Sequence, residues 1–181
     1  LKIGALNSEK ELELLRAIRR RYDHTVITLR VDANGAFTRD NVFSLMEELA
    51  ELNIHSIEQP VAAKNYQLMA EVIRNCTVPV ALDEELIGIA DKHEKEALLE
   101  ELEPAFLILK PALTGGIAAC EEWIKLADYY GIGWWATSAL EANIGLNAIA
   151  QWIATKDNPL PQGLGLGNLY HNNIASPLEL R

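Results

Sequence analysis

Charged side chains stand at regularly spaced points along this chain of 181 residues, each directly after a short apolar run. Asp32, Glu58, Asp83 and Lys110 follow one another at intervals of about 25 to 28 residues, and Lys2 precedes Asp32 by a similar step. This interval is what one strand, one helix and two short loops require. The spacing therefore predicts repeated strand–helix units, each ending its strand in a residue that can do chemistry.

The three carboxylates of this series predict a metal site. Asp32, Glu58 and Asp83 would repel one another and raise one another's pKa unless a cation lay between them. A hard divalent ion such as Mg²⁺, for which Mn²⁺ can substitute, prefers such oxygen ligands. A lysine beside other positive charge can act as a general base, so Lys2 and Lys110 at the flanks indicate metal-assisted proton abstraction next to a carboxylate.

Each of these residues also has an ordinary structural interpretation. A lone aspartate at a strand end most often sits in a turn or caps a helix. Glu58 could be a loop residue before Gln59-Pro60, and Lys110 could extend its ammonium group to solvent. Because all of them fall at the same point of the repeat, we favour one shared site.

The elements that must position these residues are predicted from hydrophobic periodicity and turn signals. Ser8 and Glu11 resemble a capping box for the first helix, and Thr38 is the expected cap of the second. A charged helix is expected over 91–102 on a solvated face, and further helices are expected over 116–130 and 141–155. The expected strands are 25–32, 54–58, 79–83, 105–110 and 132–138.

Strict alternation of strands and helices implies parallel strands, since each return needs a crossover helix. An open doubly wound sheet would carry a glycine-rich phosphate loop after its first strand, and the sequence has none there. In a (β/α) barrel, functional residues come from the C-terminal ends of several strands, as they do here. The predicted fold is therefore α/β of the TIM-barrel class, with residues 1–181 forming one barrel domain.

Composition narrows the partners and the compartment. The net charge of −10 argues against non-specific nucleic-acid binding, which depends on Lys and Arg at phosphates. Cys76 and Cys120 lie far apart and form neither a disulfide framework nor a metal pair, which favours a reducing compartment. No apolar run approaches the roughly 20 residues that span a bilayer. We expect a cytoplasmic protein that acts on a small molecule, with no membrane or nucleic-acid partner.

Several stretches together resemble a known family. They are Leu1-Lys2-Ile3-Gly4, Val31-Asp32-Ala33-Asn34, Ile57-Glu58-Gln59-Pro60, Leu82-Asp83-Glu84 and Leu109-Lys110-Pro111. As a set they are similar to the motifs of the muconate-lactonizing subgroup of the enolase superfamily. The stretches 30–32, 110–116 and 133–141 are most similar to the o-succinylbenzoate synthase family within that subgroup, and the likeness covers essentially the whole chain.

The resemblance implies a role for each of these residues. Asp32, Glu58 and Asp83 would ligate Mg²⁺, supported by Asn34, Glu84 and Arg30. Lys2 would remove the proton α to a carboxylate and then protonate the departing hydroxyl, while Lys110 would stabilise the enolate electrostatically. Thr137, Ser138 and Glu141 are the candidate substrate-binding residues. The implied reaction is dehydration of 2-succinyl-6-hydroxy-2,4-cyclohexadiene-1-carboxylate to o-succinylbenzoate, a step of menaquinone biosynthesis.

The chain also departs from the pattern of this superfamily. It contains the second lysine of the KxK motif, as Lys2, but not the first barrel strand or the α+β capping domain. We therefore expect a C-terminal barrel fragment of about six βα units, whose activity alone is weak or absent. Its exposed barrel edges are expected to be covered by another copy of the chain or by rearrangement.

Other functions of the same subgroup stay open at this point. An N-acylamino acid racemase, a dipeptide epimerase or a muconate cycloisomerase would use the same carboxylates and a different substrate wall. A binding module with a vestigial site is a further alternative. The four histidines lack ligand spacing and are expected at the surface or in loops, and the glycine-rich run 163–167 could hold an anion or form a close-packed final strand.

Overall fold

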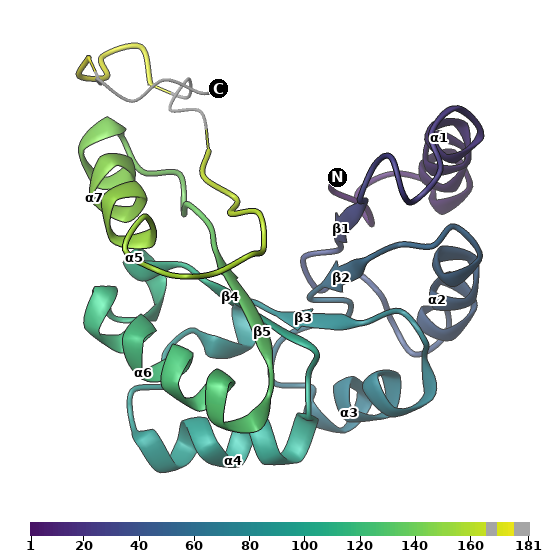
Figure 1. Cartoon of the computed structure of the whole chain (residues 1–181). Coiled ribbons are helices and arrows are strands. Elements are labelled where there is room, and N and C mark those ends of the chain that lie inside the picture. Colours follow the sequence, from purple (N-terminus) through teal and green to yellow (C-terminus); the bar gives the residue numbers. More distant parts are fainter. Residues whose placement is uncertain (166–169, 176–181) are drawn as a thin grey trace. The chain divides into compact units, whose positions relative to one another are not determined.

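The computed structural model describes residues 1–165 and 170–175, which fall into two compact units (Figure 1). Unit 1 comprises Leu1–Glu85 and Glu96–Phe106, and unit 2 comprises Leu86–Lys95 and the chain from Leu107 onward. Helices and strands alternate in both units, as the spacing of the charged residues predicts. Among the described residues, no helix is long and apolar enough to cross a membrane.

Unit 1 is built on three parallel strands, β1 (Arg30–Asp32), β2 (Ser56–Glu58) and β3 (Val80–Leu82). In the register, Asp32 lies opposite Glu58, and Glu58 lies opposite Ala81. Lys2 forms a further parallel bridge with Asp32. The strands are short, and Val31, Ile57 and Leu82 are at most 1% exposed, whereas Arg30, Asp32 and Glu58 are partly exposed.

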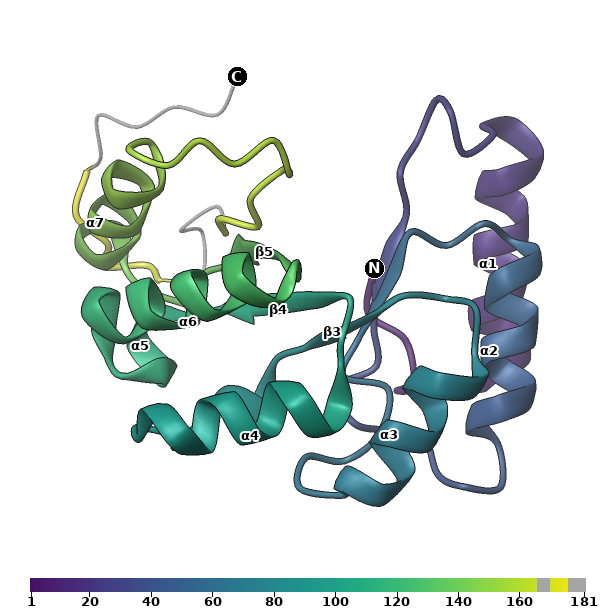
Figure 2. The same cartoon turned by 60° about the horizontal axis from the view of Figure 1, so that its bottom comes forward.

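Three helices of this unit bury an apolar stripe against the strands, and α1 and α2 lie side by side in both views (Figures 1 and 2). They are α1 (Ser8–Arg21), α2 (Val42–Glu51) and α3 (Tyr66–Asn75). The stripes follow helical spacing, as in Leu12 and Leu15 of α1 or Met46 and Leu49 of α2.

The predicted starts of α1 and α2 are wrong. Asn7, not Ser8, caps α1, because its side-chain oxygen accepts hydrogen bonds from the N–H groups of Glu9 and Lys10. Glu11 instead accepts from the backbone of Gly4, Ala5 and Leu6, which fastens the preceding loop to the helix. Thr38 is followed by a turn, and α2 begins only after Asn41.

The predicted strand over 25–32 is also wrong in its first half, since β1 begins only at Arg30. The Asp23 carboxylate accepts hydrogen bonds from the backbone N–H groups of Thr25 and Val26 and from the Thr25 hydroxyl. Such side-chain bonding favours a turn over a strand. A β-branched stretch that would suit a strand is therefore diverted into a turn by one aspartate.

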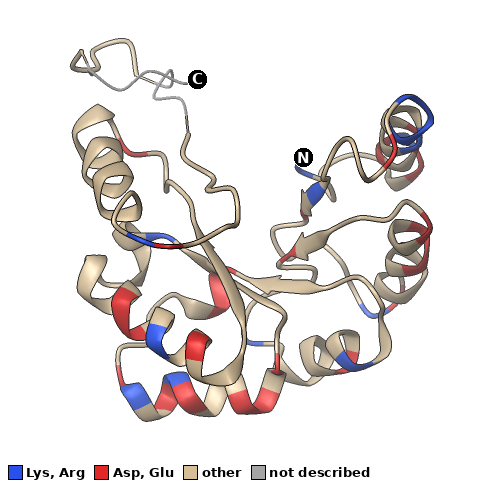
Figure 3. Ribbon diagram, in the orientation of Figure 1, with Lys and Arg blue, Asp and Glu red and all other residues tan. Residues whose placement is uncertain are grey.

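Unit 2 contains the strands β4 (Phe106–Leu109), whose first residue belongs to unit 1, and β5 (Gly133–Ala136). These strands contain no charged residue, and charge gathers on helices such as α4 and α6 instead (Figure 3). The helices of this part are α5 (Pro111–Thr114), α6 (Gly116–Tyr130) and α7 (Asn143–Ile153). Thr137 forms a parallel bridge with Gly163, so the first part of the glycine-rich run pairs like a strand, while residues 166 and 167 lie outside the described residues.

Helix α4 (Lys92–Leu102), preceded by the 3₁₀ turn η1 (Glu84–Leu86), corrects a further expectation. Its charged residues were expected on a solvated face, yet Lys95 is 0% exposed. The Lys95 ammonium donates to Glu122 Oε2 at 2.6 Å and lies 5.4 Å from the centre of the Trp123 ring. A buried lysine needs such a partner, so this residue faces the interior although its neighbours in sequence are charged.

Of the four histidines, three are exposed as expected, and His55 is not. Its ring is half-buried, stacks on the ring of Phe106 at 5.2 Å, and bonds the Ser56 hydroxyl through Nδ1 at 3.0 Å. Burial lowers the pKa of His55, and the positive charge of nearby Arg30 lowers it further. His55 therefore lies in the loop before β2, as expected, but is not fully exposed.

Candidate active site

The strand register of unit 1 places the three predicted metal ligands on one face. Asp32 and Glu58 lie opposite each other on neighbouring parallel strands, so their side chains point to the same side. Glu58 pairs with Ala81, and Asp83 follows Ala81 by two residues, which returns it to that same side. By the same alternation Arg30 shares the face, two residues before Asp32. The sheet therefore gathers these residues where its strands end.

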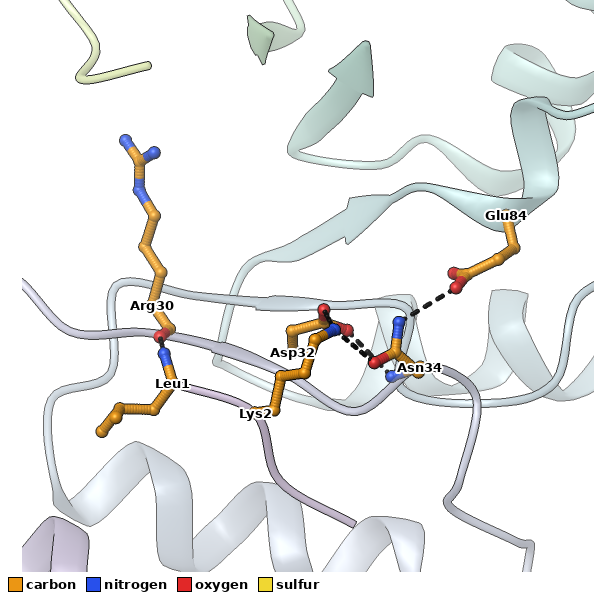
Figure 4. Close-up of polar contacts among 6 residues, drawn as sticks. All are labelled: Leu1, Lys2, Arg30, Asp32, Asn34 and Glu84. Carbon is orange, nitrogen blue, oxygen red and sulfur yellow. Dashed lines mark hydrogen bonds and ion pairs between the residues drawn. The ribbon is translucent and has the colours of Figure 1, made fainter. Parts of the chain in front are cut away.

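A chain of polar contacts links the predicted base to the predicted ligands (Figure 4). The Lys2 ammonium donates to Asp32 Oδ2 and to Asn34 Oδ1, both at 2.5 Å. Asn34 in turn donates its backbone N–H to Asp32 Oδ1 at 2.9 Å and its side-chain amide to Glu84 Oε1 at 3.0 Å. Asn34 thus links Lys2, Asp32 and Glu84, which fits the supporting role predicted for Asn34 and Glu84.

The backbone locks the loops after β1 and β2 together. Ala33 N–H donates to Glu58 O, Gly35 N–H donates to Gln59 O, and Phe37 N–H donates to Pro60 O. Asn34 and Gln59 both have positive φ, so the backbone takes an uncommon conformation for a non-glycine residue shortly after each strand. At Gly35, φ is +74° and an added Cβ would lie 3.0 Å from Ala62 Cα. Only glycine allows this close approach.

Two buried polar residues of the site were not among the predicted site residues. Gln59 is 0% exposed, and its side-chain oxygen accepts from the backbone N–H of Asp83 at 3.2 Å. Glu85 is 2% exposed and accepts from Lys64 N–H at 2.8 Å. Burial raises the pKa of the Glu85 carboxyl above its ordinary value. The sequence signal for Gln59 is weak, since a glutamine before proline usually indicates only a loop.

The remaining predicted residues belong to unit 2. Lys110 follows β4 and caps the short helix α5, and Thr137 follows β5 and donates its N–H to Leu109 O. Ser138 Oγ accepts from Gly165 N–H at 3.0 Å, and Glu141 Oε2 accepts from Ala139 N–H at 2.7 Å. Glu141 precedes α7 instead of lying in the predicted helix. Thr137 Oγ1 and Glu141 Oε1 are buried without a hydrogen-bond partner.

The predicted ligands of unit 1 suit a hard cation, because their side chains offer oxygen atoms and share one face of the sheet. The Lys2 ammonium already stands between Asp32 Oδ2 and Asn34 Oδ1, so these oxygens accept positive charge. Glu84 Oε2 is buried without a hydrogen-bond partner, which an ion or its bound water would satisfy. Across residues 1–165 and 170–175, however, no three His, Cys, Asp or Glu side chains converge closely enough to hold an ion. The metal-ligand roles of Asp32, Glu58 and Asp83 stay predictions.

Comparison with known proteins now defines the class. Residues 1–180 match the family described as "Enolase C-terminal domain-like", and the chain belongs to this family. Its fold class is accordingly that of the TIM-barrel C-terminal domain of the enolase superfamily, which confirms the prediction from strand alternation.

Among particular proteins, the chain is similar to an o-succinylbenzoate synthase of Desulfotalea psychrophila, at 46% identity over 99% of this chain and 49% of that enzyme. The crystal structure of MenC from the same organism superposes with a TM-score of 0.94 at 44% identity, over 99% of this chain and 49% of that one. An N-succinylamino acid racemase of Thermus thermophilus is 34% identical over 75% of this chain and 35% of the racemase. The chain thus spans about half the length of the relatives it matches most strongly.

Proposed function

We propose that the protein to which this chain belongs is an o-succinylbenzoate synthase-type hydro-lyase. The observation that carries the proposal is the shared face on which Lys2 contacts Asp32, with Glu58 opposite and Asp83 on the same side. The 46% identity to an o-succinylbenzoate synthase supports this substrate class over the others of the subgroup. Such a role in menaquinone biosynthesis would be expected in the cytoplasm.

Asp32, Glu58 and Asp83 would hold a Mg²⁺ ion, for which Mn²⁺ could substitute. When bound, the ion would hold the substrate carboxylate and lessen the cost of the negative charge that develops on it. Asn34 and Glu84 would keep Asp32 in place, because Asn34 donates its backbone N–H to Asp32 and its side-chain amide to Glu84. Arg30, on the same face and two residues before Asp32, adds positive charge beside Glu58.

Lys2 would move the proton in this reaction. Its neutral amine would take the proton from the ring carbon that carries the carboxylate, and the electron pair of that C–H bond would form the new ring double bond. The hydroxyl on the neighbouring carbon would leave with a proton from the Lys2 ammonium, as water, so the lysine returns to its starting state. Lys110 would stabilise the developing charge electrostatically, and Thr137, Ser138 and Glu141 would contact the substrate.

The test is an assay of the complete protein to which this chain belongs, with 2-succinyl-6-hydroxy-2,4-cyclohexadiene-1-carboxylate and Mg²⁺. Lys2→Ala is expected to lower turnover by roughly 10²- to 10⁴-fold, the usual contribution of a positioned general base. The Mg²⁺-dependent rise in melting temperature should persist in this variant, because the carboxylates remain. Lys10→Ala, at an exposed position of α1, is the matched control. Unchanged turnover in Lys2→Ala would refute the role of Lys2.

The relative named N-succinylamino acid racemase makes racemisation the second candidate. Racemisation needs a base on each side of the α-carbon, and Lys2 and Lys110 are the two lysines at strand ends that could serve. Incubation with an N-succinyl amino acid in D₂O separates the two functions. Deuterium incorporation with inversion would favour the racemase, and its absence alongside dehydration would favour the synthase.

A further inference from the structure

The buried side chain of Gln59 continues the β2–β3 pairing past the point where the strands end. The last backbone bond between these strands runs from Gln59 N–H to Ala81 O at 2.9 Å. Two residues further on, the backbone N–H of Asp83 donates to Gln59 Oε1 at 3.2 Å. One residue therefore holds the end of β3 by its backbone and Asp83 by its side chain.

The other end of the same amide is also held. Gln59 Nε2 donates to Val61 O at 3.0 Å and lies 3.5 Å from Glu85 Oε1. Glu85 accepts from Lys64 N–H through its second oxygen at 2.8 Å, which ties it to the loop after β2. Both side chains are almost completely buried, at 0% and 2% exposure. A buried amide with its oxygen and nitrogen both engaged has one preferred orientation.

We infer that Gln59 is a positioning residue for Asp83 and that Glu85 holds Gln59 in the required orientation. This inference rests on the proposed role of Asp83 as a metal ligand. Asp83 is 2% exposed and lies between the last residue of β3 and η1. Loss of the Gln59 oxygen would remove its bond to the buried Asp83 N–H, and the turn would shift in response.

The arrangement predicts an effect on metal affinity in addition to any effect on stability. Residues that orient metal ligands typically alter metal affinity by roughly 10- to 100-fold when they are replaced. Gln59→Met keeps the volume of the side chain and removes both its acceptor and its donor. Glu85→Gln keeps one acceptor oxygen in place of two, which can take the bond from Gln59 or from Lys64 N–H, whereas Glu85→Met removes both. Gln67→Met, at an exposed position of α3, is the matched control.

The experiment measures Mg²⁺ binding to the full chain by calorimetry and hydrogen exchange of the Asp83 amide without metal. Gln59→Met should accelerate exchange at Asp83 and weaken Mg²⁺ binding by roughly 10- to 100-fold. Glu85→Met should weaken it less, and Glu85→Gln, which keeps one acceptor, should weaken it less than Glu85→Met does. Asp83→Asn serves as the reference for loss of the ligand itself.

Two outcomes separate this inference from the proposed function. If Asp83→Asn loses Mg²⁺ binding but Gln59→Met keeps it despite faster exchange at Asp83, the positioning role is refuted and the metal site stands. If Asp83→Asn binds Mg²⁺ like the parent chain, the metal site itself is refuted. Should Gln59→Met fail to fold, equal Mg²⁺ affinity in Glu85→Met and Glu85→Gln would overturn the inference.

Discussion

The strand ends of unit 1 and those of unit 2 hold their polar side chains in different ways. In unit 1, Lys2, Asp32, Asn34 and Glu84 bond to one another, and Gln59 fixes the backbone of Asp83. In unit 2, Ser138 and Glu141 instead accept from backbone N–H groups of nearby loops. Two buried oxygens of this second region, Thr137 Oγ1 and Glu141 Oε1, have no hydrogen-bond partner.

This difference indicates that the two regions have different roles. The first region holds its own charged groups in fixed relative positions, which a metal centre needs before any substrate arrives. Among the described residues, the second region buries two side-chain oxygens without a hydrogen-bond partner and the first region buries one, Glu84 Oε2, and each costs free energy in the absence of a ligand. A region proposed to hold a cation and a region with more unpartnered oxygens should respond differently to the loss of one oxygen.

The largest expected contrast comes from removing one oxygen function in each region. Asp32→Asn should abolish the Mg²⁺-dependent rise in melting temperature and reduce turnover to background, because it removes a ligand and the partner of Lys2. Thr137→Val should leave the Mg²⁺ effect unchanged, since it removes only an unpartnered hydroxyl. We expect this second variant to have equal or slightly higher stability and a KM raised by about tenfold at most.

Thermal melts with and without Mg²⁺, together with steady-state kinetics, measure both variants. If Thr137→Val removed the Mg²⁺ effect as completely as Asp32→Asn, the proposed division between the two regions would be wrong.

A smaller contrast is expected at the two glycines that bring loops together. Gly35→Ala places a Cβ 3.0 Å from Ala62 Cα at a φ of +74°, so backbone must move, and we expect a loss of about 3 kcal/mol in unfolding free energy. In Gly165→Ala, the added Cβ would lie 2.7 Å from Ser138 Oγ, which is the end of a side chain that can rotate. Its cost should be about 1 kcal/mol, from the lost Gly165 to Ser138 hydrogen bond. Urea unfolding of both variants measures the difference, and equal losses would contradict it.

The sequence predicted the larger features of the fold for a physical reason. Strand–helix alternation and the position of Asp32, Glu58 and Asp83 after apolar runs depend on local hydrophobic patterns, which are visible in one dimension. The family comparison confirms the fold class that follows from them. Helix α6 (Gly116–Tyr130) was predicted with its bounds, because Gly115 and Gly131 mark both ends through left-handed backbone conformations.

Features that depend on contacts between distant residues could not be predicted in this way. Lys95 lies in a run of charged residues, and only Glu122 and Trp123, from another helix, explain its burial. The positioning contact of Gln59 depends on Asp83, which is remote in sequence and becomes a neighbour only through the strand register. The strand predicted at 25–32 begins late, at Arg30, because the turn made by Asp23 competes with the strand propensity of the residues that follow it.

The smallest predicted effect concerns the end of β2 that lies away from the carboxylates, where His55 directly precedes the strand. Burial is the main cause that lowers the pKa of His55, and Arg30 adds to it, while its other close neighbours, Phe106 and Ser56, carry no charge. The unfolded chain should bind a proton here at its ordinary pKa near 6.5, before the folded chain does. The stability from neutral His55 is therefore fully present above about pH 6.5 and declines as pH falls toward the lowered pKa.

His55→Phe keeps a ring to stack on Phe106 and removes the titrating group. The free energy of unfolding of this variant, measured in urea between pH 5 and pH 8, should fall less on acidification than that of the parent chain. His24→Phe, at an exposed position, is the matched control for the replacement of one histidine. An identical acid dependence in His55→Phe and the parent would show that His55 contributes nothing to the acid sensitivity of the fold.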